Sequence, residues 1–284
     1  MKAITTVNEM KEYSRKAREK AKSIGFVPTM GALHDGHMSL VKAARKECDT
    51  VIVSIFVNPT QFGPAEDFEK YPRRMKEDRK KAEDAGADCI FAPDADQMYP
   101  GGHATHVELD ASLADVLCGK SRPGHFRGVA TVVAKLFNII RPDKSYFGQK
   151  DAQQVIIIEK MVEDLNMDTE IVVMPIIREE DGLAMSSRNG YLSEDERRQA
   201  LGLYRSLKWA EEAVSSGERA SGKVKGRMKE ILSEGENIRI DYIEVLDART
   251  LKPFGEIRDN TLIAVAAFVG KTRLIDNTVV RIRK

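Results

Sequence analysis

Two hydrophobic patterns alternate over the first 175 residues. Short apolar runs, which are typical of strands buried on both faces of a parallel sheet, occur at residues 23–29, 51–57, 88–91, 144–147 and 171–174. Segments with apolar residues at the helical period occur at residues 3–22, from about 36 onward, and at 67–85, 131–140 and 153–165. This alternation predicts a doubly wound, Rossmann-like α/β fold with right-handed crossovers, whose ligand site lies at the carboxyl ends of the strands.

The pattern changes after Pro175. Two charged helices are predicted at residues 194–216 and 222–235, and strands with alternating or continuous apolar residues follow near 238–242, 262–269 and 272–280. The last two strands are separated by a Gly270–Lys271 turn, which favours an antiparallel pair. We therefore predict two domains: residues 1–178, a Rossmann-like α/β domain, and residues 179–284, a smaller α+β domain.

Composition narrows the class of protein. The 284 residues carry 45 Lys and Arg against 44 Asp and Glu, a net charge of +1, which argues against a dedicated nucleic-acid binder. The chain has no apolar run long enough for a membrane span, and its charged first residues lack the apolar region of a secretory signal, so we expect a cytoplasmic protein. Cys48, Cys89 and Cys118 are far apart, as expected of reduced thiols.

The strongest chemical motif is PTMGALHDGHMSL, residues 28–40, where a predicted strand leads through Gly31 and Gly36 into a helix. The spacing of His34 and His37 places both imidazoles on one face of the first helical turn. The unpaired amides and the helix dipole at that end favour a phosphate group, so a triphosphate is a suitable ligand. The alternative is a glycine-rich turn with two exposed histidines.

Three further motifs follow predicted strands or the domain junction. FVNPTQF, residues 56–62, offers the amides of Asn58 and Gln61 to a polar substrate, although Asn58 could merely cap a turn. In YFGQKDAQQ, residues 146–154, Lys150 can reach phosphate oxygens, unless it is only a solvated charge beside a helix-capping Asp151. GLAMSSRN, residues 182–189, supplies hydroxyl groups and a guanidinium for a phosphate clamp.

Other patterns point away from redox and metal chemistry. A GxGxxG sequence after the first strand and a GxxxxGK[ST] sequence are both absent, which disfavours dinucleotide redox chemistry and a P-loop. His103 and His106 follow two glycines and have no cysteine nearby in the sequence, so solvated histidines are favoured over a zinc site. SRPGHFRG, residues 121–128, is by itself only a basic loop. Phosphate-binding groups and polar amides without a conventional nucleophile indicate group transfer on a nucleotide.

HDGH resembles the HxGH signature of the class I synthetase and nucleotidyltransferase superfamily, and MSSRN resembles its KMSKS-type loop. The motifs PTMGALHDGH, FVNPTQF, YPR, RPGHFRGVATVV, FGQKDAQQ and DGLAMSSRN, in this order, closely resemble the pantothenate synthetase (pantoate–β-alanine ligase) family. This resemblance implies ATP-dependent condensation of (R)-pantoate with β-alanine through a pantoyl adenylate, with release of pyrophosphate and AMP. It also implies Mg²⁺ and a homodimer. We further expect the carboxyl-terminal domain of this chain to act as a lid over the bound ligands.

The resemblance also implies roles for residues of this chain. Catalysis would rest on His34, His37, Lys150 and Arg188, with His37 the proposed proton donor as pyrophosphate leaves. ATP would contact Met30, Gly31, His34, His37, Gly148, Gln149, Lys150, Asp151, Ile177, Met185, Ser186, Ser187 and Arg188. Pantoate and β-alanine would contact Asn58, Gln61, Arg122, His125 and Gln154. The family's magnesium-associated acidic stretch here reads RRMKEDRK, which leaves Glu77 and Asp78 as metal candidates.

Two other functions remain open at this point. A nucleotidyltransferase that moves AMP onto a phosphorylated acceptor would share the HxGH motif and the second loop, although Gln61 and Gln154 favour an uncharged polyol carboxylate. A non-catalytic ATP sensor would need the phosphate-binding residues but no polar acceptor site beside them.

Overall fold

The computed structural model describes residues 1–64, 66–101 and 103–282, and it divides into two compact units. Unit 1 consists of Met1–Asp110, Arg122–Gly148 and Ile157–Pro175. Unit 2 consists of Ala111–Ser121, Gln149–Ile156 and Ile176–Lys284. Two short segments that precede Ile176 in the sequence therefore belong to the carboxyl-terminal unit. The domain boundary placed between residues 178 and 179, and the lid role of the second domain, stay predictions.

Unit 1 is built on a parallel sheet, as predicted. In the described part of the chain it has six strands in the order β1-β4-β3-β2-β5-β6. Their bounds are β1 Lys2–Ile4, β2 Ile24–Thr29, β3 Thr50–Ile55, β4 Cys89–Phe91, β5 Lys144–Gly148 and β6 Glu170–Met174. The chain proceeds outward from β2 to β3 and β4 and then returns to β5 on the other side of β2. This reversal makes the carboxyl ends of β2 and β5 the expected ligand-binding edge.

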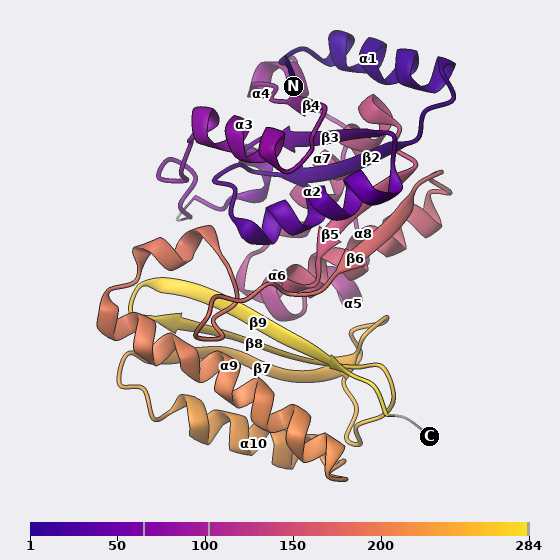
Figure 1. Ribbon diagram of the computed structural model, residues 1–284. Coiled ribbons are helices and arrows are strands. Elements are labelled where there is room, and N and C mark those ends of the chain that lie inside the picture. The colour runs from indigo at the N-terminus through magenta and orange to yellow at the C-terminus, as the bar shows by residue number, and fades with distance from the viewer. Residues whose placement is uncertain (65, 102, 283–284) are drawn as a thin grey trace. The chain divides into compact units, whose positions relative to one another are not determined.

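Helices cover both faces of this sheet (Figure 1). They are α1 Val7–Glu19, α2 Asp35–Glu47, α3 Met75–Asp84, α4 Ala95–Met98, α7 His125–Ile140 and part of α8 Ala152–Asp164. Adjacent residues of β2 show why helices are needed on both faces of the sheet. Val27 shares a buried cluster with Val41 of α2, whereas Phe26 packs edge-on against Phe137 of α7, with ring centroids 6.3 Å apart. Because β3 is buried on both faces, its continuous apolar run is explained.

Three boundaries differ from those expected. The helix predicted over residues 3–22 is instead the edge strand β1 followed by α1, and a three-residue strand is too short for its period to be recognised. The helix predicted from residue 67 starts only at Met75, after Pro72. The helix predicted from residue 131 starts at His125, because Gly124 adopts φ +78° and allows the chain to turn into α7.

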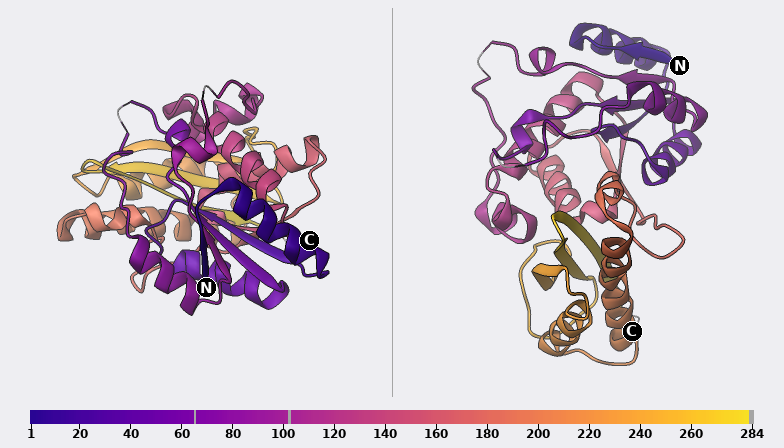
Figure 2. Two further views of the ribbon diagram at one scale, coloured as in Figure 1. Left: turned by 90° about the horizontal axis from the view of Figure 1, so that it is seen from above. Right: turned by 90° about the vertical axis from the view of Figure 1, so that its left-hand side faces the viewer.

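Unit 2 contains an antiparallel sheet, as predicted. Its strands β7 Ile238–Asp247, β8 Thr261–Val269 and β9 Thr272–Val280 follow one another in space. The helices α9 Glu194–Ser215 and α10 Ser221–Leu232 pack beside each other against one face of this sheet (Figure 2). Leu207 and Met228 meet the central strand β8 in a common buried cluster. Unit 2 also holds α5 Ala111–Ala114 and α6 Leu117–Ser121.

Among the described residues, we find no helix whose length and apolar content would suffice to cross a membrane.

Candidate active site

His34 and His37 occupy the amino terminus of α2, directly after the carboxyl end of β2. His34 is the N-cap, and its Nδ1 accepts a hydrogen bond of 3.2 Å from the Gly36 N–H. His37 lies one turn further, and its Nδ1 accepts a bond of 3.3 Å from the His34 N–H. The ring centroids are 4.1 Å apart. The two side chains therefore form a reciprocal capping box at a helix end that attracts anions.

These bonds determine which ring nitrogen carries the proton. Because each Nδ1 accepts a bond from a backbone N–H, the neutral form of each imidazole has its proton on Nε2. An Nε2–H group is a hydrogen-bond donor. The capping box thus presents two histidines as donors, as binding of phosphate oxygens requires.

The loop before α2 is held by Asp78 of α3. Its Oδ2 accepts a 2.9 Å bond from the Ala32 N–H, and its Oδ1 accepts a 2.7 Å bond from the Leu33 N–H. Lys81, one turn along α3, donates to the Leu33 carbonyl at 2.7 Å. Gly31 adopts φ +86°, which glycine tolerates, whereas Ala32 adopts φ +51°, which is unfavourable for a residue with a Cβ and needs such support. Asp78 therefore anchors the segment that positions the histidine pair.

This arrangement does not fit the predicted metal role of Glu77 and Asp78. The Asp78 side chain is only 2% exposed, and each of its oxygens is already bonded to an amide. Glu77 is exposed on the outside of α3 and pairs with Arg74 at 3.7 Å. The described residues contain no group of three or more His, Cys, Asp or Glu side chains able to hold a metal ion. We therefore assign no step of the reaction to a protein-bound metal at these two residues.

Asn58 and Gln61 lie at the 3₁₀ turn η1 (Pro59–Gln61), just after β3. Asn58 is 1% exposed, and its Nδ2 donates to Gln61 Oε1 at 3.0 Å and to the Gly128 carbonyl at 3.2 Å. Its Oδ1 accepts from Tyr99 and from the backbone and hydroxyl of Thr60. The hydrogen-bonding capacity of Asn58 is therefore used within the protein. Asn58 orients Gln61, whose Nε2 lies 3.2 Å from Met30 Sδ.

Arg122 and His125 are joined to the same group through Gln61. Arg122 forms a two-pronged ion pair with Glu66, at 2.7 and 2.6 Å, and its Nη1 lies 2.9 Å from His125 Nε2. Since a guanidinium can only donate, Nε2 accepts and His125 Nδ1 carries the proton that it donates to the Gln61 carbonyl at 2.8 Å. Burial raises the pKa of Glu66, but the bonds and charge of Arg122 outweigh it and leave that pKa lowered.

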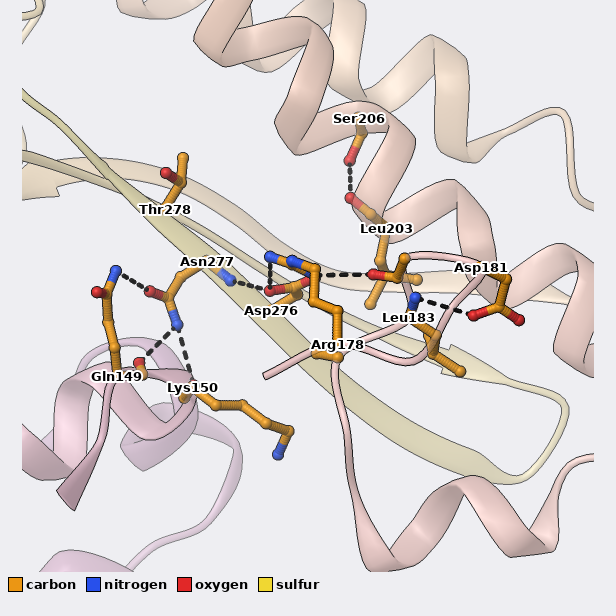
Figure 3. A network of polar contacts seen from close by, with 12 residues as sticks. Gln149, Lys150, Arg178, Asp181, Leu183, Leu203, Ser206, Asp276, Asn277 and Thr278 are labelled. Atoms are coloured by element: carbon orange, nitrogen blue, oxygen red, sulfur yellow. Dashed lines mark hydrogen bonds and ion pairs between the residues drawn. The ribbon is translucent and has the colours of Figure 1, made fainter. Parts of the chain in front are cut away.

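Lys150 belongs to a second cluster of predicted residues, within unit 2. It lies in the 3₁₀ turn η2 (Gln149–Asp151), which follows β5, and its Nζ is 4.0 Å from Asp151 Oδ2. The turn is held by Asn277 of β9, whose Nδ2 donates to the Gln149 and Lys150 carbonyls at 3.0 and 2.9 Å (Figure 3). No local pattern in the sequence marks Asn277, because the carbonyl groups that it binds are 127 and 128 residues away.

Ile177 and the Met185–Arg188 segment are connected by a short hairpin. The Met185 N–H donates to the Ile177 carbonyl at 3.0 Å, and Arg178 pairs with Ala184 in an antiparallel bridge. Ser186 caps the 3₁₀ turn η3 (Ser187–Tyr191) by accepting from the Arg188 N–H at 3.2 Å. These bonds gather the predicted ATP-binding residues of this segment on one structured loop.

The structure thus collects the predicted residues into two groups. In unit 1, the contacts described above link the loop that carries Met30 and the histidine pair with Gln61, Asn58, His125 and Arg122. Gly148 ends the neighbouring strand β5. In unit 2, Gln149, Lys150 and Asp151 share η2, and Gln154 follows in α8. Its neighbour Gln153 is structural, because it bonds to the backbone of Leu113, Val116 and Cys118.

Two other features of unit 1 lie outside these groups. His103 and His106 contact each other edge to face at 4.8 Å, and His103 also contacts the Tyr99 ring at 4.7 Å. A cavity of about 160 Å³ lies near the amino ends of β5 and β6, opposite the expected ligand edge, and is lined by Phe137, Asn138, Arg141, Pro142, Met167, Asp168 and Thr169.

A parallel sheet with a topological switch point, and an HxGH sequence capping the helix after β2, define a nucleotide-binding α/β protein of the HxGH class. Comparison with known proteins is more specific. The chain belongs to the pantoate–β-alanine ligase family, whose model matches residues 2–279.

Individual relatives agree with this family. Pantothenate synthetase from Thermotoga petrophila is 58% identical over 98% of this chain and 99% of its own, and the enzyme from Moorella thermoacetica is 52% identical over 99% of each chain. The crystal structure of pantothenate synthetase from Thermus thermophilus matches with a TM-score of 0.93 at 42% identity, covering 98% of this chain and 99% of that chain. Pantoate–β-alanine ligase from Francisella tularensis, complexed with β,γ-ATP and β-alanine, matches with a TM-score of 0.81 at 35% identity, covering 98% and 97%.

Proposed function

We propose that the protein joins (R)-pantoate to β-alanine at the expense of ATP. In the first step a pantoate carboxylate oxygen attacks the α-phosphorus of ATP, the bond to the β-phosphate bridging oxygen breaks, and pyrophosphate leaves. In the second step the β-alanine amine attacks the acyl carbon of pantoyl adenylate, loses a proton and displaces AMP. The observation that carries the proposal is the HxGH capping box after β2 in a chain whose family match covers residues 2–279.

The first step brings two anions together, so it depends on positive and hydrogen-bond-donating groups placed around the phosphates. His34 and His37 supply Nε2 donors at a helix amino terminus. We assign His37 the role of hydrogen-bond donor, through its Nε2–H, and of electrostatic stabiliser as pyrophosphate leaves, with Lys150 and Arg188 neutralising phosphate charge. The remaining proposed ATP contacts are Met30, Gly31, Gly148, Gln149, Asp151, Ile177, Met185, Ser186 and Ser187.

We assign pantoate binding to Gln61 and Gln154, and we place Asn58, Arg122 and His125 around them. The internal bonds of the last three residues support positioning roles. Asn58 fixes Gln61 Oε1, and His125 fixes the Gln61 carbonyl, so that both ends of Gln61 are held in place. An amide group held in this way suits a substrate that carries hydroxyl groups and a carboxylate.

Magnesium enters the proposal as the counter-ion of the ATP phosphates. The contacts of Asp78 give no support for a ligand pair at Glu77 and Asp78. The family resemblance further supports a homodimer in the cytoplasm, and sedimentation analysis of the purified chain tests the dimer.

The decisive experiment incubates the purified protein with ATP, Mg²⁺ and pantoate, with and without β-alanine, and follows the products by mass spectrometry. We expect AMP and pantothenate in equal amounts only when β-alanine is present. A stable product that retains the AMP group would instead establish a nucleotidyltransferase. ATP binding without any turnover would favour an ATP sensor and would contradict the proposed ligase activity.

A further inference from the structure

Two neighbouring residues of β9 hold two separate segments of the proposed ATP site (Figure 3). The first is Asn277, which is 3% exposed. Its Nδ2 donates to the carbonyls of Gln149 and Lys150, and its Oδ1 accepts a 3.3 Å bond from Gln149 Nε2. Asn277 therefore holds both the backbone of η2 and the side chain of its first residue.

The second residue is Asp276, which is also 3% exposed. Its two oxygens accept bonds of 2.6 and 3.0 Å from the guanidinium of Arg178, which also donates to the Gly182 carbonyl at 3.1 Å. The same guanidinium lies 4.5 Å from the centre of the Tyr204 ring. Through Arg178, Asp276 fixes the hairpin that leads into the Met185–Arg188 segment.

The two residues hold their segments from one regular stretch of β9. Asp276 and Asn277 are adjacent, and the Asn277 N–H donates to Asp276 Oδ1 at 2.8 Å. Both residues lie on an edge strand whose register with β8 is regular on either side of them. Because each side chain binds only its own segment, replacing one of them should displace that segment and leave the other in place.

We propose that Asp276 and Asn277 are positioning residues that set the places of Lys150 and Arg188 for the phosphates of ATP. Asn277 acts through the turn that carries Lys150, and Asp276 acts through the hairpin that precedes Arg188. The inference rests on the proposed function in one respect, namely that ATP is the ligand of these two cations.

The test is a double-mutant cycle on the full chain, with ATP affinity measured by isothermal titration calorimetry. Asn277→Asp keeps the size of the side chain but removes the Nδ2 donor and places a carboxylate against two carbonyls. We expect it to weaken ATP binding about tenfold, the order expected for losing two hydrogen bonds. The loss should largely disappear in a Lys150→Ala background and persist in an Arg188→Ala background.

Asp276→Asn should behave in the opposite way, with its loss disappearing in the Arg188→Ala background and persisting in the Lys150→Ala background. The matched control is Thr278→Val. Thr278 is the next residue of β9, and its hydroxyl donates to Glu211 of α9. We expect this variant to bind ATP like the wild type. Thermal unfolding of each variant verifies that it is folded.

Three results would overturn the inference. They are unchanged ATP affinity in folded Asn277→Asp and Asp276→Asn, an equal loss in both alanine backgrounds, and a comparable loss in Thr278→Val. Since calorimetry needs no turnover, the result is separable from the proposed ligase activity. If the wild type binds ATP and the variants show the expected coupling but no pantothenate forms, the ligase activity is refuted and the inference stands. If the wild type does not bind ATP, both are refuted.

Discussion

Asp78 offers a direct test of how the histidine pair is positioned. Asp78→Asn preserves the volume of a buried side chain but replaces one of its two acceptors by an amide that faces a backbone N–H. A bond to a charged acceptor contributes about 1.5–3 kcal/mol, so losing one should lower the free energy of unfolding by about that amount. Asp78→Ala removes both acceptors and should lower it by about 3–6 kcal/mol.

The effect on function follows from the loop that Asp78 holds. Ala32 adopts φ +51°, which costs roughly 1–2 kcal/mol for a residue with a Cβ, and the bonds to Asp78 offset this cost. Without them the loop relaxes, and the N-cap of α2 moves with it. Asp78→Asn should therefore weaken ATP binding measured by calorimetry in the absence of magnesium.

Glu77→Gln is the matched control, because Glu77 is the preceding residue of α3 but is exposed. Urea unfolding should place its stability within about 0.5 kcal/mol of the wild type, as for other surface substitutions. The anchoring role would be refuted if Asp78→Asn kept both its stability and its magnesium-free affinity for ATP while requiring more magnesium for turnover. That pattern is the signature of a lost metal ligand.

Three further predictions concern the other parts of the site. His37→Asn retains an acceptor near the position of Nδ1 but lacks the Nε2 donor, so its unfolding free energy should stay near that of the wild type while kcat falls at least about a hundredfold. His37→Gln should show the larger loss of stability. Wild-type kcat in His37→Asn would contradict the assigned role. Asn58→Ala should raise KM for pantoate about tenfold through displacement of Gln61 and leave KM for ATP unchanged. Steady-state kinetics with each substrate varied in turn measures both constants, and a raised KM for ATP with an unchanged KM for pantoate would contradict this role. The lowered pKa of Glu66 means that its ion pair with Arg122 stabilises the fold above the ordinary pKa of 4.5, and that this contribution is lost as the pH falls through the lowered value. In denaturant unfolding over this range, the unfolding free energy of Glu66→Gln should depend less on pH than that of the wild type. An unchanged dependence would contradict the assignment.

The sheet of unit 1 could largely be predicted from the sequence because its strands are buried on both faces. The continuous apolar run over β3 has no other explanation in a chain with this alternation. The edge strand β1 gave no such signal, since of its three residues only Ile4 is buried. The start of α7 was hidden by glycine, which usually marks a turn but here provides the left-handed residue that begins the helix.

The candidate site was predictable only where its residues are close together in the sequence. His34 and His37 stand in one motif, and the structure confirms that their spacing produces a helix amino terminus. Asp78 and Asn277 bind backbone atoms 45 or more residues away, and no local pattern indicates such a bond. Asp78 stands in the stretch that the family resemblance associates with magnesium, and that resemblance, rather than any local pattern, is the basis of its predicted metal role.

The chemical identity of these two residues follows from the backbone that each must hold. The loop before α2 presents the N–H groups of Ala32 and Leu33, and an acceptor-only carboxylate, Asp78, satisfies both of them. The turn after β5 presents carbonyl groups, and the amide of Asn277 satisfies two of those as a donor. Exchange of either residue for its isostere reverses the match without altering its size. Asp78→Asn and Asn277→Asp should thus both weaken ATP binding although they change charge in opposite directions, a result that no account based on net charge at the phosphate site would produce.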